Sequence, residues 1–379
     1  MDSITQILLG ATVGVAACGR TLGRRRSIVW GGVGGLLPDL DAIVAAPFDE
    51  FTRLAAHRGV SHALWFGAAL GTILGYFSWR WSRRRDPSGA GSPRALRHWI
   101  SLWALSIVTH PLLDLFTSYG TQLFAPFSRR RFVVEAIGII DPVYSLVLLT
   151  AVVWAWRSRK GPDRTMRVAR AALVISTAYV LSGVWLNRRA ELEAKHQLAA
   201  SGLHDAQVIA YATPLQLSLR RIVARTPDAV RIGYLAAFNP GPIHWWSFEP
   251  EKSELIEKLR ATPEGRLFEW FAQHQTVGRT VAPTATAAFR RVEIDDIRYG
   301  MPSVPQEGFW GIAAEFDGTG RNVSPVRRIS RPRNIEGYMI ADLFRAALGH
   351  DPRTFRVGLP SLLPTAKIGR GGRIRTGDP

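Results

Sequence analysis

Three short segments of the N-terminal half contain the residue types that bind divalent metals. They read Pro38-Asp39-Leu40-Asp41, His57-Arg58-Gly59-Val60-Ser61-His62 and His110-Pro111-Leu112-Leu113-Asp114. Each lies in or beside an apolar stretch, where a charge is costly unless it is paired, hydrated or bound to a metal. Carboxylates and imidazoles are ligands of zinc and manganese. The segments therefore predict a site for a divalent ion if the fold brings them together.

The spacing within two of these segments limits how their side chains can meet. His110 and Asp114 are four residues apart, so on a helix they share one face, and Pro111 is expected to bend that helix. Asp39 and Asp41 are two residues apart, which points them apart on a helix and together on extended backbone. A broken helix with local extended backbone is expected, because these carboxylates follow Gly31, Gly32, Gly34, Gly35 and Pro38.

The third segment needs a turn between its two histidines. Gly59 can supply the turn, and Ser61 is a candidate N-cap for the helix that follows. Taken singly, these residues also have ordinary roles: a helix cap for Asp39 or Asp41, core packing for His62 or His110, and neutralisation of Arg58 for Asp114. The combination of three segments favours a metal or catalytic site over these alternatives.

The composition divides the chain into two unlike halves. Of 379 residues, those up to about 187 form apolar stretches separated by arginine clusters, and those from 188 onward are mixed. The net charge of +18 would suit nucleic acid, but arginines between apolar stretches are typical of membrane proteins. We therefore expect the lipid bilayer as a partner and no direct contact with nucleic acid. The single cysteine, Cys18, excludes an intrachain disulfide.

Six apolar stretches predict about six membrane helices. Val60–Trp79 is the strongest, because twenty residues without a formal charge can cross roughly 30 Å of hydrocarbon. Arginines follow the first stretch instead of preceding it, which argues against a signal peptide. The six stretches are Ile4–Gly19, Ile28–Phe48, Val60–Trp81, Trp99–Tyr119, Ile139–Trp156 and Val168–Leu186.

Basic residues are unevenly distributed over the connections between these stretches. The first, third and fifth connections hold fifteen basic residues against Asp86 and Asp163, whereas the second and fourth hold few. The cluster Arg129–Arg131 in the fourth connection departs from this pattern. By the positive-inside rule, the odd connections are cytoplasmic and the C-terminal half faces outward. This multi-pass topology places the three segments at one membrane face.

With these segments, the chain resembles the LexA-binding, inner-membrane-associated hydrolase family, often described as membrane-bound metal-dependent hydrolases. The resemblance covers roughly residues 1–190, in order and at family-like spacing. Ser61 stands where many relatives have threonine, which keeps the hydroxyl group. Besides the three segments, the resemblance rests on Met1-Asp2-Ser3-Ile4-Thr5-Gln6, Gly35-Leu36-Leu37, Thr109, Leu115-Phe116-Thr117-Ser118-Tyr119-Gly120-Thr121-Gln122, Pro126-Phe127-Ser128 and Ile140-Asp141-Pro142.

The resemblance implies an integral protein of the bacterial inner membrane with a metal-dependent hydrolase site. The implied ion is zinc or manganese, and the implied ligands exceed the about four of a single zinc site. Either two ions share the pocket or one carboxylate is a general base. The implied ligands are Asp39, Asp41, His57, His62, His110 and Asp114.

Asp39 and Arg58 are the expected catalytic residues. Arg58 could hold a phosphate or carboxylate of the substrate or, equally, form a salt bridge with Asp41 or Asp114. Residues expected around the ligands are Tyr119, Gln122 and Asp141.

The C-terminal half has the pattern of an extramembrane domain. Residues 188–210 read as a polar helical extension, and from Gln216 short runs of β character alternate with Gly and Pro. Core or surface roles are favoured for His244-Trp245-Trp246 and Asp295-Asp296. We expect a mainly α fold: a polytopic helical bundle over 1–190, a small α+β or β-rich domain over 191–360 and a disordered basic tail over 361–379.

Two functions of different classes are consistent with these features. The first is a membrane-bound hydrolase in which metal-activated water attacks an ester or phosphoester at the outer face of the inner membrane. The second is a non-enzymatic scaffold or regulatory binding protein with a structural metal or polar site, for which the resemblance implies a LexA-like regulator. The outward orientation argues against the second function, because such a regulator lies in the cytoplasm.

Overall fold

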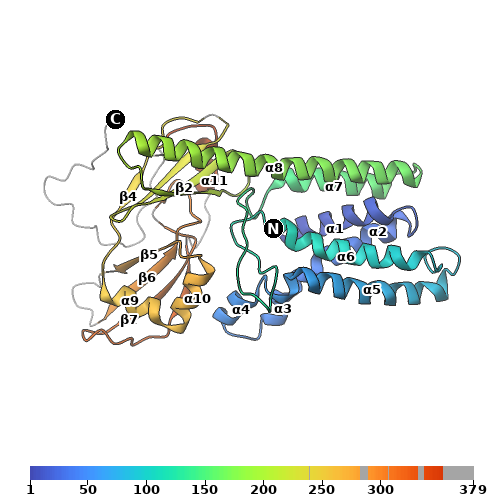
Figure 1. The fold of residues 1–379 in the computed structure, drawn as a ribbon, viewed down its shortest axis with the longest axis horizontal. Coiled ribbons are helices and arrows are strands. Elements are labelled where there is room, and N and C mark those ends of the chain that lie inside the picture. The colour runs from blue at the N-terminus through green and yellow to red at the C-terminus, as the bar shows by residue number, and fades with distance from the viewer. Residues whose placement is uncertain (239, 282–288, 306, 332–336, 353–379) are drawn as a thin grey trace. The chain divides into compact units, whose positions relative to one another are not determined.

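The chain divides into two compact units (Figure 1). The computed structural model describes residues 1–352 except 239, 282–288, 306 and 332–336, so the tail predicted at 361–379 lies outside the described residues. The first unit contains Met1–Trp185 and Ala212–Leu217. The second contains Leu186–Tyr211 and the described residues from Ser218 onward.

The first unit is built from helices that run back and forth (Figure 1). Three of them begin at a capping carboxylate: Asp2, Asp49 and Asp141 accept hydrogen bonds from the backbone N–H groups of Thr5, Thr52 and Tyr144, respectively. The elements are α1 (Ser3–Cys18), α2 (Arg24–Leu36), the 3₁₀ helix η1 (Leu37–Leu40), α3 (Asp41–Ala45), α4 (Glu50–Ala56), η2 (Val60–His62), α5 (Leu64–Arg85), α6 (Ala95–Asp114), α7 (Pro142–Arg157) and the first part of α8 (Pro162–Ala200).

The prediction of about six membrane spans was wrong. Among the described residues, two helical segments are long and apolar enough to cross a membrane, Arg24–Ala45 and Pro162–Ala200. A third results only if α4–η2 and α5, bent by 61°, are one span. The helices α1 and α7 have sixteen residues each, or about 24 Å, which is shorter than the hydrocarbon layer. The multi-pass topology is therefore not confirmed, and the outward orientation of the C-terminal half stays a prediction.

Glycines bring α1 and α2 into backbone contact. A Cβ atom on Gly10 would lie 2.2 Å from the carbonyl oxygen of Gly31, and one on Gly35 would lie 2.2 Å from that of Gln6. Small residues permit this approach at helix interfaces in membrane proteins. The two helices pack closely because both carry glycine where they meet.

The expectation of extended backbone around Asp39 and Asp41 was wrong. Residues 31–35 lie inside α2, and Leu36, Leu40 and Asp41 keep right-handed helical angles through η1 and into α3. The glycines serve the packing of α2 on α1 and do not break the helix. As a result, the two carboxylates point in different directions.

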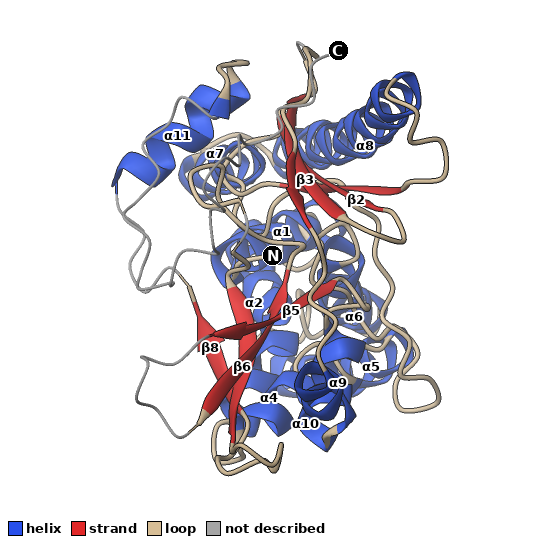
Figure 2. Cartoon of the chain, turned by 90° about the vertical axis from the view of Figure 1, so that its left-hand side faces the viewer, coloured by secondary structure: helices blue, strands red, loops and turns tan. Residues whose placement is uncertain are grey.

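The second unit contains two four-stranded sheets, with antiparallel pairing from β2 to β4 and from β5 to β8 (Figure 2). The end of α8 packs on the first sheet, where Ala194 and Leu198 meet Ile222 and Leu235. This part agrees with the predicted β-rich C-terminal region. The elements are β1 (Gln207–Ala212), β2 (Leu219–Arg225), β3 (Val230–Ala236), β4 (Trp246–Phe248), α9 (Glu254–Ala261), α10 (Pro263–Phe271), β5 (Thr276–Val281), β6 (Arg290–Asp296), β7 (Trp310–Phe316), β8 (Arg327–Ser330) and α11 (Gly337–Ala347).

A network of ion pairs lies in the second sheet. Glu293 and Asp295 on β6 both pair with Arg279 on β5 and with Arg331 after β8. Burial would raise the pKa of Glu293, but the guanidinium groups of Arg331 and Arg279 outweigh it and lower that pKa. Burial raises the pKa of Asp295 despite the same two arginines. Asp296 pairs with Arg298 at 2.7 Å, so both acidic residues of Asp295-Asp296 have core roles.

Candidate metal centre

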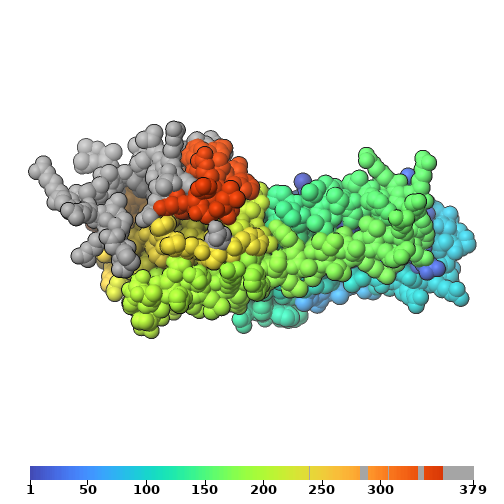
Figure 3. All heavy atoms as spheres, turned by 90° about the horizontal axis from the view of Figure 1, so that it is seen from above, coloured from blue at the N-terminus to red at the C-terminus, as the bar shows by residue number. Residues whose placement is uncertain are grey.

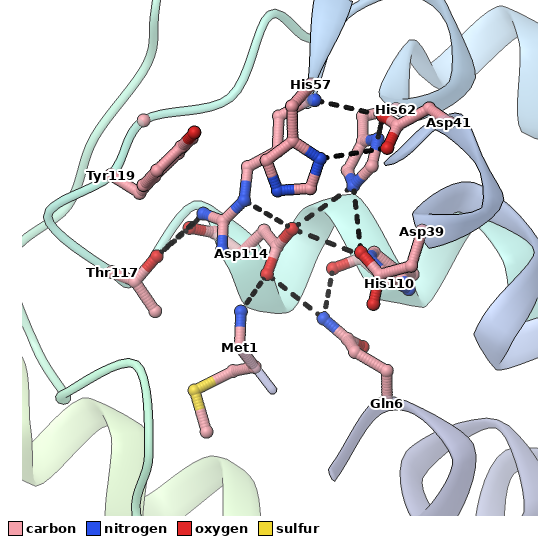
Figure 4. Close-up of polar contacts among 12 residues, drawn as sticks. Met1, Gln6, Asp39, Asp41, His57, His62, His110, Asp114, Thr117 and Tyr119 are labelled. Atoms are coloured by element: carbon pink, nitrogen blue, oxygen red, sulfur yellow. Dashed lines mark hydrogen bonds and ion pairs between the residues drawn. The ribbon is translucent and has the colours of Figure 1, made fainter. Parts of the chain in front are cut away.

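Four polar atoms from the three predicted segments meet at one place in the first unit (Figure 4). His62 Nε2 lies 3.3 Å from Asp114 Oδ2 and 3.9 Å from Asp39 Oδ1. His110 Nε2 lies 3.5 Å and 3.4 Å from the same two oxygens. Asp39, His62 and His110 each offer one ligand atom, all within 4.8 Å of one another.

The helix ends explain why these side chains converge. His110 and Asp114 lie in the last turns of α6, one turn apart on the same face, and Asp39 lies in η1 directly after α2. His62 ends η2, which follows a sharp turn at Arg58 with a φ of 59°. Such a backbone conformation is uncommon for a residue with a side chain and is maintained by the contacts around it.

The cluster contains buried polar atoms without a hydrogen bond in the described protein. His62 Nε2, His110 Nε2 and Asp114 Oδ2 are buried and have no hydrogen-bond partner among the described residues, and only Asp114 Oδ2 has a counter-charge, Arg58 Nε at 3.1 Å. An unsatisfied buried group costs about 1–3 kcal/mol, so the two histidine nitrogens at one place indicate a binding site. Ligand atoms around tetrahedral zinc lie roughly 3.3 Å apart, as follows from zinc–ligand distances of about 2.0–2.1 Å. The ligand atoms of Asp39, His62 and His110, all within 4.8 Å of one another, are close enough to hold one divalent ion.

Contacts of Nδ1 hold the rings of His62 and His110 so that Nε2 of each ring faces the cluster. His110 Nδ1 donates a hydrogen bond to the carbonyl oxygen of Gly35 across 2.6 Å. His62 Nδ1 lies 2.9 Å from Ser61 Oγ and 3.4 Å from Asp41 Oδ2. A carbonyl oxygen only accepts, so Nδ1 of His110 carries a proton and its Nε2 is the ring nitrogen that faces the cluster.

Asp41 and His57 lie outside this central group. Asp41 accepts hydrogen bonds from His57 Nδ1 at 2.8 Å, from the backbone N–H of Arg58 at 3.0 Å and from Ser61 Oγ at 2.8 Å. Asp41 therefore holds the turn that carries His62. The expected N-cap role of Ser61 was wrong, because α5 begins after Ala63 and has no side-chain cap.

Arg58 is the buried counter-charge of Asp114. Its Nε lies 3.1 Å from Asp114 Oδ2, and it donates a hydrogen bond from Nη1 to Thr117 Oγ1 at 2.9 Å. The guanidinium group also lies over the ring of Tyr119, 4.6 Å from its centroid. The geometry therefore corresponds to the salt-bridge alternative for Arg58. The catalytic role expected for Arg58 stays a prediction.

The sequence assigned no role to three residues in or just before α1 that contact the cluster. Gln6 donates to Asp114 Oδ1 at 3.1 Å and to the carbonyl oxygen of His110 at 3.3 Å. Ser3 donates to Asp39 Oδ2 at 2.7 Å, and the amino group of Met1 donates to Asp114. An amide inside the apolar stretch Ile4–Gly19 was the available signal for Gln6.

The three residues expected around the ligands have different surroundings. Tyr119 contacts Arg58 and packs edge-on against His57. Gln122 donates to the carbonyl oxygen of Ala55, so it supports the same turn. Asp141 caps α7 and accepts a hydrogen bond from Tyr179.

The comparison with known families gives this helical unit a membrane setting. The model of the YdjM inner membrane protein family matches residues 1–190, the part of the chain that carries the cluster. The chain belongs to this family. It is also similar to the uncharacterized protein YfhP of Bacillus subtilis (strain 168), at 23% identity over 62% of this chain and 68% of YfhP. No solved structure matches. Membership in the YdjM family supports a membrane location, whereas LexA binding and hydrolysis rest on the earlier resemblance.

Proposed function

We propose that this YdjM family protein is a membrane-bound hydrolase of esters or phosphoesters that depends on a divalent ion. The proposal rests on one observation, the convergence of buried, unsatisfied atoms of His62, His110 and Asp114 beside Asp39. Asp39, His62 and His110 would hold the ion. When bound, the ion supplies Lewis-acid polarisation of the substrate and makes water more acidic.

The two carboxylates of the cluster suit different tasks. Asp114 is fully buried beside the positive charge of Arg58, which makes it a weak base and a suitable partner for a cation. Asp39 keeps 13% of its side chain exposed, while His62, His110 and Asp114 are fully buried. Water and substrate would therefore reach the cluster at Asp39. We assign its Oδ1, which faces the two histidines, to the ion and its Oδ2, which accepts from Ser3, to the proton of the attacking water.

A second function is favoured by the burial of the cluster. Two of the three candidate ligands, His62 and His110, are out of contact with solvent, and enclosed sites are typical of structural zinc. In this case the protein is a membrane scaffold or binding protein. A LexA-like regulator as its partner belongs to this second proposal and rests on the resemblance alone.

Metal analysis combined with an esterase and phosphodiesterase assay on the full chain in detergent separates the two functions. We expect about one zinc or manganese ion per chain and turnover of a nitrophenyl ester or phosphodiester. His110→Ala should lose both, while the matched control His98→Ala, on the same helix but away from the cluster, should keep both. Bound ion without turnover would favour the scaffold. A wild-type protein that binds no ion would contradict both functions.

A further inference from the structure

The three basic connections of the helical unit carry a large excess of positive charge. Residues 20–26, 80–97 and 157–167 hold fifteen Lys and Arg residues and two acidic ones, a difference of 15 − 2 = +13. All of the basic side chains are exposed except Arg24, which is half-buried. The two acids already have partners, since Asp86 pairs with Arg26 and Asp163 with Arg20.

These connections form one continuous surface, which we call the basic surface. The Arg26–Asp86 pair, at 2.7 Å, joins residues 20–26 to residues 80–97. The Arg20–Asp163 pair, at 3.5 Å, joins residues 20–26 to residues 157–167. Figures 1 and 3 show the three connections side by side at the right-hand end of the helical unit. The metal cluster lies at the opposite helix ends, near the start of α1 (Figure 1).

The basic surface coincides with the ends of all segments that could cross a membrane. The two candidate spans begin there, at Arg24 and at Pro162, and α5 ends there at Arg85. Because one end of each segment lies in this surface, the surface would lie at one boundary of the hydrocarbon layer when these segments cross it.

Tryptophans border the basic surface on its apolar side. Arg83 lies over the ring of Trp79 and Arg85 over that of Trp81, with 5.0 Å and 4.6 Å to the ring centroids. Arg25 lies over Trp156 at 5.5 Å. Trp81 and Trp156 are also exposed, as are apolar neighbours such as Phe77. Tryptophan at this depth is typical of the headgroup region, with arginine reaching outward from it.

A cavity of about 400 Å³ opens within the basic surface. It is lined by Arg94 and Arg97 together with Pro93, Leu96 and Ile100. Two positive charges beside apolar side chains match a molecule that has a phosphate at one end and hydrocarbon at the other. We propose that the basic surface binds the headgroups of anionic phospholipids, with Arg94 and Arg97 holding one phosphate in this cavity. Nucleic acid would match the charge but not the tryptophans or the apolar lining.

Lipid titration of the full chain in neutral detergent tests this proposal. We expect phosphatidylglycerol to remain bound in native mass spectrometry and to raise the thermal midpoint, and phosphatidylcholine to do neither. Replacing the three exposed residues Arg84, Arg94 and Arg97 with Gln should reduce retained phosphatidylglycerol several-fold. Replacing them with Lys should preserve most of the binding.

The matched control removes the same charge from the second unit, by changing the exposed residues Arg290, Arg321 and Arg327 to Gln. This variant should retain phosphatidylglycerol as the wild type does. Equal retention of the two lipids, equal loss in both Gln variants, or displacement of phosphatidylglycerol by a short RNA would each overturn the proposal. Metal content should stay unchanged in every variant, so the result is independent of the proposed hydrolase.

Discussion

His62 Nε2 lies 3.3 Å from Asp114 Oδ2, and neither atom has a hydrogen-bond partner among the described residues. The two atoms come from segments 52 residues apart in sequence, one at the end of η2 and one at the end of α6. Arg58 offsets the charge of Asp114 Oδ2 from 3.1 Å, whereas the buried His62 Nε2 has no hydrogen bond within the described part of the chain, a placement that is costly unless an ion binds there.

Removal of the ion should destabilise the wild-type protein. A chelator should lower the thermal midpoint of the detergent-purified chain by about 4–10 °C, because a ligand present at 100 times its Kd adds about 2.7 kcal/mol. His62→Ala should not respond to the chelator, since the ion has lost a ligand. Differential scanning fluorimetry measures both. A wild type that melts identically with and without chelator would argue against the metal site.

Asp41→Asn should weaken ion binding without abolishing it. Asp41 holds the turn of His57 and Ser61 and contacts His62 Nδ1, so its loss should reduce metal affinity by about 10–100-fold. Competition with a fluorescent chelator measures the affinity. Asp49→Asn, which changes only the exposed cap of α4, is the control and should bind the ion as the wild type does. Complete loss of the ion in Asp41→Asn would instead identify Asp41 as a direct ligand.

Arg58→Gln should destabilise the helical unit strongly. The change leaves the buried Asp114 carboxylate without its guanidinium partner, which typically costs about 3–5 kcal/mol. Arg26→Gln breaks an exposed pair with Asp86 and should have little effect. Denaturation in mixed micelles, followed by tryptophan fluorescence, compares the two variants. Similar decreases in the free energy of unfolding of both variants would contradict the larger contribution expected of the buried pair.

The second unit should lose stability in acid through Glu293. Its folded pKa is lowered, so its contribution is fully present above the unfolded pKa of about 4.5 and is lost as pH falls through the folded value. The difference in unfolding free energy between wild type and Glu293→Gln should therefore shrink from about pH 6 to about pH 3. The contribution of Asp295 to stability has the opposite pH dependence, because burial raises the pKa of this carboxyl. A difference that stays constant over this range would contradict the assignment.

The sequence predicted where helices and strands occur better than it predicted how far the helices reach. Helices formed at all six apolar stretches, but α1 and α7 are too short to span on their own. The glycines before Asp39 were misread, because a glycine that breaks a helix and one that admits a neighbouring helix look alike in one sequence. The contact of Gly35 with Gln6 exists only in three dimensions.

Within the site, the sequence identified the residue types. It did not show that Asp41 and His57 lie outside the central group of candidate ligands. Asp39 faces His110 and Asp41 faces His57 because the backbone stays helical between them. Gln6 was missed because it makes its contacts across more than a hundred residues, and no local spacing reports them.

The backbone contact between α1 and α2 also determines which part of the cluster can move. At Gly10 and Gly35 the backbones of α1 and α2 pack so closely that no side chain fits between them, so we expect the two helices to move as one rigid unit. His110 is attached to this helix pair by its hydrogen bond to the carbonyl oxygen of Gly35 in α2. The turn that carries His57 and His62 is held mainly by hydrogen bonds to Asp41 and Gln122. We therefore expect the cluster to open by a movement of this turn about Arg58 and Gly59, while α1 and α2 stay fixed.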